Sequence, residues 1–125
     1  MGNKTYMASV TRTTRPLILD VEKLRRANAL PTTATAYKQG DLLTLSAANV
    51  LTHAADASTW DVICGQDVTA EEATQMAKDG VELPIYYGGV FSVEGVMLNS
   101  TLLTSEQYAA ARAQATKNKI ELSKV

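Results

Sequence analysis

Short apolar runs, separated by polar and glycine-containing stretches, dominate the pattern of this chain. The runs around 17–19, 42–45 and 60–64 have the length and the aliphatic or β-branched content of buried strands. Pro16 precedes the first run, and a proline fits the first residue of a strand because it has no N–H to donate to a ladder. We therefore expect strands at 16–20, 42–45 and 60–64, with a polar, alanine-rich loop between the last two.

The stretch 81–93 predicts a β-hairpin. Residues 81–87 alternate between apolar and polar positions, and Pro84 restricts this strand to a sheet edge or a bulge. Gly88 and Gly89 can adopt the positive φ angles of a two-residue hairpin turn, which would lead into a second strand at 90–93. A last short strand is expected at 120–122.

Two capping boxes mark the starts of two short helices. Thr69 stands three residues before Glu72, and Gly80 is placed to end the helix that follows. Thr104 stands three residues before Gln107 at the start of the second helix. Both boxes predict helices of a few turns.

The segment 21–39 has a weaker pattern. Residues 21–27 could form one or two helical turns, which would stop before Pro31 because the residue before a proline avoids the helical region. Residues 32–36 are expected to be loop or extended chain. The fold class that results is mainly β with two short helices (α+β), in one compact domain over 16–125.

Residues 1–15 are expected to form a flexible arm. They are rich in threonine, show no helical period and hold too little apolar surface to fold alone. Threonine nevertheless favours extended backbone. Such an arm suits strand addition to the sheet edge of a partner, with side-chain pockets for Tyr6, Met7 and Val10. A simply frayed terminus is the alternative.

Composition allows a stable core but favours self-association. The chain has 125 residues, 46% of them hydrophobic, which is enough to bury a core without disulfides or metal. It contains one phenylalanine and one tryptophan, so large apolar side chains are scarce. Its single cysteine excludes an internal disulfide, and no apolar stretch reaches the length of a membrane span.

Charge is distributed unevenly along the chain. The formal net charge of -1 provides no general attraction to nucleic acid or anionic lipid. The first 15 residues carry Lys4, Arg12 and Arg15 without an acidic residue, whereas residues 41–82 carry eight acidic residues and Lys78 as the one base. A basic end and an acidic body could meet different partners.

No catalytic motif is present. His53 is the one histidine and would have to reach Cys64 for thiol catalysis, but a buried structural thiol is the more usual state of a free cysteine. Asp67, Glu71 and Glu72 surround a helix N-terminus, where capping explains them better than calcium binding. We expect no catalytic residue, no metal and no cofactor.

The aromatic residues allow two interpretations. Trp60, Tyr86 and Tyr87 could form a stacking platform for single-stranded nucleic acid. Their surroundings in the sequence are acidic, which favours a core or a subunit interface instead. Because interfaces are enriched in tryptophan and tyrosine, we expect these three residues and Phe91 at a subunit interface.

The order of these segments resembles the head decoration proteins of lambda-like tailed phages. The matching features fall on 16–20, 63–70, 85–93 and the closing strand, while Gly88-Gly89 and Val90 stand where the family has a single glycine and a charged residue. The resemblance implies a non-enzymatic homotrimer on the outer surface of the virion, assembled in the host cytoplasm and bound at the local threefold axes of the expanded head.

In such a protein each N-terminal arm would add a strand to the major capsid protein. The arm residues expected to bind the capsid are Tyr6, Met7, Val10, Thr11, Arg12, Thr14, Arg15 and Pro16. The alternative is another phage structural or adaptor module, or a small nucleic-acid-binding domain that uses its basic arm.

Overall fold

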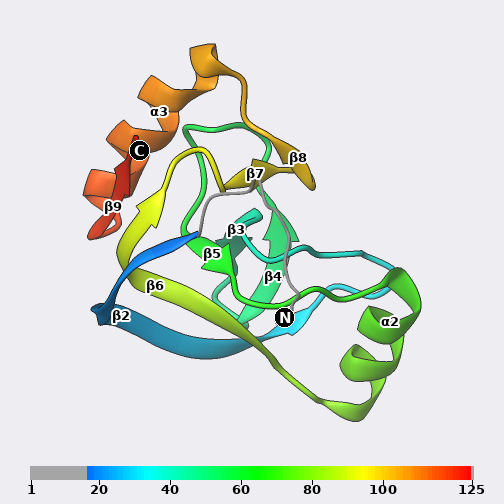
Figure 1. Ribbon diagram of the computed structural model, residues 1–125. Helices are drawn as coiled ribbons and strands as arrows, with labels where there is room; N and C mark the ends of the chain where they lie inside the picture. Colours follow the sequence, from blue (N-terminus) through cyan, green and yellow to red (C-terminus); the bar gives the residue numbers. More distant parts are fainter. Residues whose placement is uncertain (1–16, 125) are drawn as a thin grey trace, which may run out of the picture.

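The computed structural model describes residues 17–124, which form a mainly β fold with two helices (Figure 1). This confirms the expected fold class. In chain order the elements are β2 (Ile18–Pro31), β3 (Leu42–Leu45), β4 (Val50–His53), β5 (Val62–Cys64), α2 (Ala70–Asp79), β6 (Leu83–Ser92), β7 (Met97–Leu98), β8 (Thr101–Leu102), α3 (Ser105–Lys117) and β9 (Ile120–Ser123).

The strand pairings of the main sheet close into a ring. β2 pairs with β4, β4 with β3, β3 with β5, β5 with β6, and β6 again with β2. The β2–β4 link consists of two parallel pairs, Leu30 with Val50 and Pro31 with Leu51. β9 lies outside the ring, parallel to the last residues of β6. Closing a small sheet in this way leaves few exposed edges.

The longest pairing joins β2 and β6, and it overturns the prediction of helical turns at 21–27. β2 runs antiparallel to β6 from Ile18, opposite Phe91, to Ala29, opposite Leu83. The register shifts between Asp20 and Arg25, where β2 bulges out. The hydrogen bonds of this ladder outweigh the weak helical preference of the segment, because local propensity is worth only tenths of a kcal/mol per residue.

β6 also runs straight through the predicted hairpin turn, so that prediction was wrong. Arg26 lies opposite Tyr86 and Arg25 opposite Gly88, which leaves Tyr87 as an extra residue, a β-bulge. Gly89 does have a positive φ, 135°, but it uses this freedom inside a strand. The Gly88-Gly89 pair therefore lies in an irregular part of strand β6 and does not reverse the chain.

Two further details of the sheet differ from expectation. Pro84 lies near the start of an inner strand, where its carbonyl accepts a hydrogen bond from the Gly65 N–H at 3.0 Å, so β6 is not an edge strand. The supposed loop between β3 and β5 contains β4, which reverses from β3 through a turn with Asn49 at a φ of 65°. Only Val50 and Leu51 are large apolar residues in β4, which is too weak a pattern for a strand prediction.

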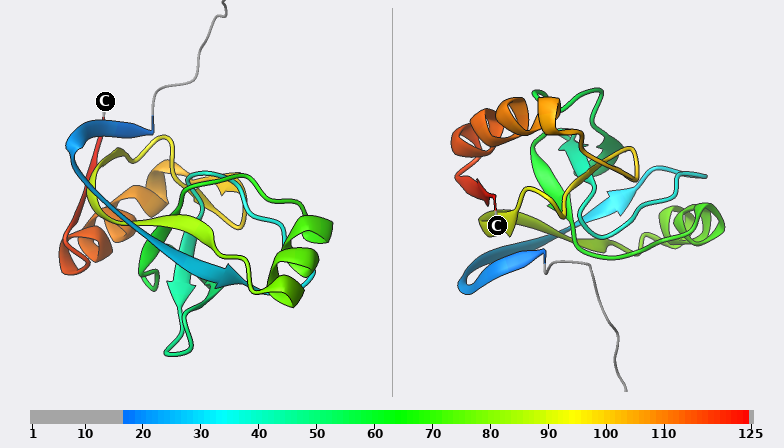
Figure 2. Two further views of the ribbon diagram at one scale, coloured as in Figure 1. Left: turned by 90° about the horizontal axis from the view of Figure 1, so that it is seen from below. Right: turned by 45° about the horizontal axis from the view of Figure 1, so that its top comes forward.

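Both helices begin at the predicted caps. At the start of α2 the Thr69 hydroxyl accepts a hydrogen bond from the Glu72 N–H at 3.1 Å, and the Glu72 carboxylate accepts one from the Thr69 N–H at 2.8 Å. Gly80 ends this helix with a φ of 71°. At α3 the side-chain oxygen of Gln107 accepts from the Thr104 N–H at 2.9 Å. α2 and α3 lie at opposite ends of the molecule in both views of Figure 2.

The core has two parts, one near each helix. The part that includes α3 and β9 contains Trp60 and Phe91, and the part that includes α2 contains Tyr37 and Leu51. Each helix contributes small residues to its core, of which Ala73 and Ala111 are completely buried. Alanine lets the helices approach the sheet closely.

Candidate functional site

The residues expected to bind a capsid all lie outside the described part of the chain. They are Tyr6, Met7, Val10, Thr11, Arg12, Thr14, Arg15 and Pro16. The described chain begins at Leu17, whose carbonyl accepts a hydrogen bond from the Ser92 N–H at 2.8 Å. Any segment before Leu17 therefore joins the body at the carboxyl end of β6.

Three of the four rings expected at a subunit interface are part of the core of the chain itself. Trp60 and Phe91 have no exposed surface, and Tyr86 is 6% exposed. Because a residue without accessible surface cannot contact another subunit, the interface assignment is wrong for Trp60 and Phe91, and Tyr86 has almost no surface for such a contact. Tyr87 is 48% exposed and is the one ring of the four that remains available.

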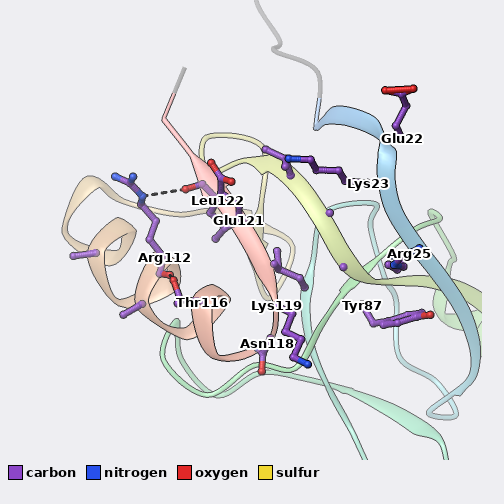
Figure 3. A pocket seen from close by; sticks show the side chains of 16 residues that line it. Glu22, Lys23, Arg25, Tyr87, Arg112, Thr116, Asn118, Lys119, Glu121 and Leu122 are labelled. Carbon is purple, nitrogen blue, oxygen red and sulfur yellow. Dashed lines mark hydrogen bonds between the residues drawn. The ribbon is translucent and has the colours of Figure 1, made fainter.

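Tyr87 lines an open groove of about 1160 Å³ formed by β2, β6, α3 and β9 (Figure 3). The charged side chains around it are mostly basic. Its cations are Lys23, Arg25, Arg112 and Lys119, and its carboxylates are Glu22 and Glu121. We call this feature the cationic groove.

The irregularities of β2 and β6 shape the groove. The extra residue in β6 displaces Tyr87 from the regular alternation, and such bulges commonly redirect a side chain. Gly88 leaves room for the stem of Arg25, since a Cβ on Gly88 would lie 2.7 Å from the Arg25 Cγ. Gly88 and Gly89 both line the groove and contribute no side chain to it.

Most cations of the groove have no anionic partner. Within residues 17–124, no hydrogen bond or ion pair involves the side chains of Lys23, Arg25 or Lys119. Arg112 donates from Nε to the Leu122 carbonyl at 3.0 Å and so connects α3 to the outer edge of β9, as the dashed line in Figure 3 shows. These positive charges are available to an external partner.

No local pattern in the sequence predicts this groove. Its cations come from three separate segments, so no single stretch of sequence carries the pattern. The one local signal is the run Glu22 to Arg26, which has four charged residues among five and favours helical turns when the sequence is considered alone. In β2 the same run lies where the register against β6 shifts, between Asp20 and Arg26.

The one histidine and the one cysteine do not form a catalytic pair. His53 stacks on Tyr37, with ring centroids 5.2 Å apart, and its Nε2 lies 2.7 Å from the Ala36 carbonyl. The Cys64 thiol donates to the Gln66 carbonyl at 3.1 Å, and burial raises its pKa to about 12. At neutral pH the thiol is protonated, so it is a poor nucleophile.

Residues 17–124 hold no group of three or more His, Cys, Asp or Glu side chains suited to a metal ion. None of their helices is both long enough and apolar enough to cross a membrane. Comparison of the sequence with protein-family models and with curated proteins gave no match.

Proposed function

We propose that this protein is a capsid decoration protein that binds the outside of a tailed-phage head as a homotrimer and stabilises the expanded capsid. The proposal rests on the resemblance in segment order. In this function the N-terminal segment 1–15 adds a strand to the major capsid protein, and the body over 16–125 holds neighbouring capsid subunits together against the pressure of packaged DNA. The function requires no reaction.

The observation that best supports the proposal is the place where the N-terminal segment joins the body. Leu17 bonds to Ser92 on one side of β6, and the Ser123 carbonyl accepts from the Val93 N–H at 2.9 Å on the other side. A capsid-bound segment would therefore pull on the longest strand pair of the molecule. This attachment suits a protein that must transmit force from its N-terminus to a stable body.

Energetics explain why such a protein would need several N-terminal segments. Adding one strand gains roughly 1 kcal/mol per hydrogen bond, while ordering the chain costs about 1 to 2 kcal/mol per residue. One segment alone roughly breaks even, so affinity must come from side-chain pockets and from three segments that bind at once. Such multivalency adds about a hundredfold or more without new contacts.

Co-sedimentation with expanded, empty phage capsids tests the proposal. The full chain should sediment with the capsids and raise their resistance to heat or to loss of divalent cations. A variant that lacks residues 1–15 should remain in the supernatant. Full-strength binding by the truncated variant would contradict the role of the N-terminal segment, and no binding by the full chain to any candidate capsid would contradict the function.

A small nucleic-acid-binding domain is the second candidate, and the cationic groove is the observation that favours it. Unpaired cations beside an exposed tyrosine are the kind of arrangement that binds single-stranded nucleic acid. In a pull-down that offers capsids and single-stranded DNA separately, retention by DNA alone would support this candidate over the first.

A further inference from the structure

Charge is divided between the two ends of the molecule. The end that contains α2 carries a mainly acidic surface, which we call the acidic end; it has five exposed carboxylates, those of Asp67, Glu71, Glu72, Asp79 and Glu82, and one exposed base, Lys78. The cationic groove lies at the other end, beside α3 and β9, and Figures 1 and 2 show the two ends far apart in every view. The molecule therefore has two surfaces of opposite sign that cannot neutralise each other within one chain.

Each of these surfaces has an exposed apolar residue beside its charges. Tyr87 in the cationic groove is 48% exposed, and Val81, between Asp79 and Glu82 after α2, is 50% exposed. An apolar or aromatic centre with a charged rim is the usual composition of a protein interface. Both surfaces have this composition.

The charges on both surfaces are available. The side chains of Lys23, Arg25 and Lys119 make no ion pair within the described residues. On the acidic end, Asp79 accepts a hydrogen bond from Gln75 and Glu82 accepts one from Asn49, but both partners are neutral amides. Neither surface has lost its charge to internal salt bridges.

A second copy of the chain complements both surfaces, whereas a partner of one sign complements only one. A nucleic acid bound in the cationic groove would leave the acidic end without a partner, and the net charge of -1 gives it no overall attraction to the protein. Two copies arranged head to tail bring the acidic end of one to the groove of the next. This arrangement is heterologous, and because the two surfaces lie at opposite ends of the molecule, repeated contacts place successive copies in a row.

We infer that the cationic groove binds the acidic end of a second copy of this chain. In the contact, Arg25 and Lys119 of one copy face Asp79 and Glu82 of the next, and Tyr87 packs near Val81. The inference goes beyond the proposed function: surfaces at opposite ends of the molecule join successive copies in a row, a contact separate from any association of subunits around a threefold axis. It leaves the N-terminal segments free for another partner.

Charge reversal on the full chain tests the inference. The double variant Arg25→Glu, Lys119→Glu should raise the dissociation constant for self-association by about tenfold or more, measured by sedimentation equilibrium, because like charges then face each other. The double variant Asp79→Lys, Glu82→Lys should do the same. A matched control, Lys38→Glu with Lys117→Glu, changes the net charge as much as the first variant but lies outside the groove, and should assemble like the wild type.

Restoration of the contact makes the test specific. The variant with all four reversals should assemble with itself again. Mixing the two double variants gives a second measurement that needs no fourfold substitution: the mixture should assemble more strongly than either variant alone, with the two variants alternating along each assembly. Circular dichroism on each variant checks that it is folded.

Several results would overturn the inference. They are a wild type that stays monomeric at high micromolar concentration, and reversed variants that assemble as well as the wild type. A monomer that binds single-stranded DNA through Arg25 and Lys119 would assign the groove to nucleic acid instead. Failure of this inference can be distinguished from failure of the proposed function. A monomer that binds capsids would support the proposed function and contradict this contact. A head-to-tail oligomer that does not bind capsids would support this contact and contradict the proposed function.

Discussion

At the scale of single residues, burial decides what the polar groups of this protein can do. The Cys64 thiol is completely buried in β5, and desolvation is the largest cause that raises its pKa, followed in the same direction by the nearby carboxylates of Asp41 and Asp67. Burial likewise raises the pKa of the Tyr37 phenol. Both groups are held in their neutral forms, which suits a structural role.

The raised pKa of Cys64 predicts a loss of stability in alkaline solution. The folded state holds the proton more tightly than the unfolded state, so the contribution of this thiol is complete below its ordinary pKa of 9.0 and is lost as the pH rises toward about 12. Urea denaturation across this range measures the effect. Cys64→Ser is the control, and it should lower the free energy of unfolding by about 1 to 2 kcal/mol. Its free energy of unfolding should fall less with rising pH than that of the wild type, but should still fall somewhat, because Tyr37 titrates in both proteins. Equal pH dependence in the two proteins would contradict the prediction.

Gly89 should be far less replaceable than Gly80, although both have a positive φ. Gly80 has a φ of 71° and nothing within 4 Å of an added Cβ, so Gly80→Ala should cost about 1 kcal/mol. At Gly89 the φ is 135°, and an added Cβ would lie 3.2 Å from the Phe91 ring and 3.3 Å from the Leu24 backbone. Strain of that kind costs roughly 1 to 3 kcal/mol before any contact is counted. Thermal denaturation of the two alanine variants should rank Gly89→Ala as the more damaging, and equal losses would contradict this.

At the scale of elements, the caps and most strands followed from sequence, but the long strand β2 did not. The boxes at Thr69 and Thr104 act within four residues, so local sequence is sufficient to find them. β2 is a strand because β6, more than fifty residues later, pairs with it. The groove between them depends on that pairing and on a bulge at Tyr87, and no local pattern reports either feature. Local sequence predicts that Trp60 and Phe91 are buried, but it does not show whether they are buried within one chain or between two chains.

Asp41 should be essential for attaching the β7–β8 hairpin to the sheet. Its carboxylate is completely buried and accepts from the Lys38 N–H at 2.7 Å, the Ser100 N–H at 2.7 Å and the Ser100 hydroxyl at 2.9 Å. Asp41→Ala should cost about 3 kcal/mol or more, because it leaves two backbone donors without a partner, whereas Ser100→Ala removes one bond and should cost about 1 kcal/mol. Chemical denaturation measures both. Losses of equal size would show that the carboxylate does not hold the hairpin.

At the scale of the whole molecule, the described residues 17–124 hold two clusters of buried side chains and a ring of strands that closes among these residues. We therefore predict that a variant without residues 1–15 keeps the melting temperature of the full chain within a few degrees. Differential scanning calorimetry on both proteins tests this. A large drop in the melting temperature would show that the N-terminal segment is part of the folded body.

The attachment of Leu17 also determines how the body would respond to mechanical load. β2 is antiparallel to β6 along most of its length, so tension along β2 loads many hydrogen bonds of this pair together. Tension across the sheet would instead break them one after another from Ile18. The folded body should therefore resist a force along β2 strongly and unfold easily under a force across the sheet. The direction in which its N-terminus is pulled would decide whether the β2–β6 pair holds or separates.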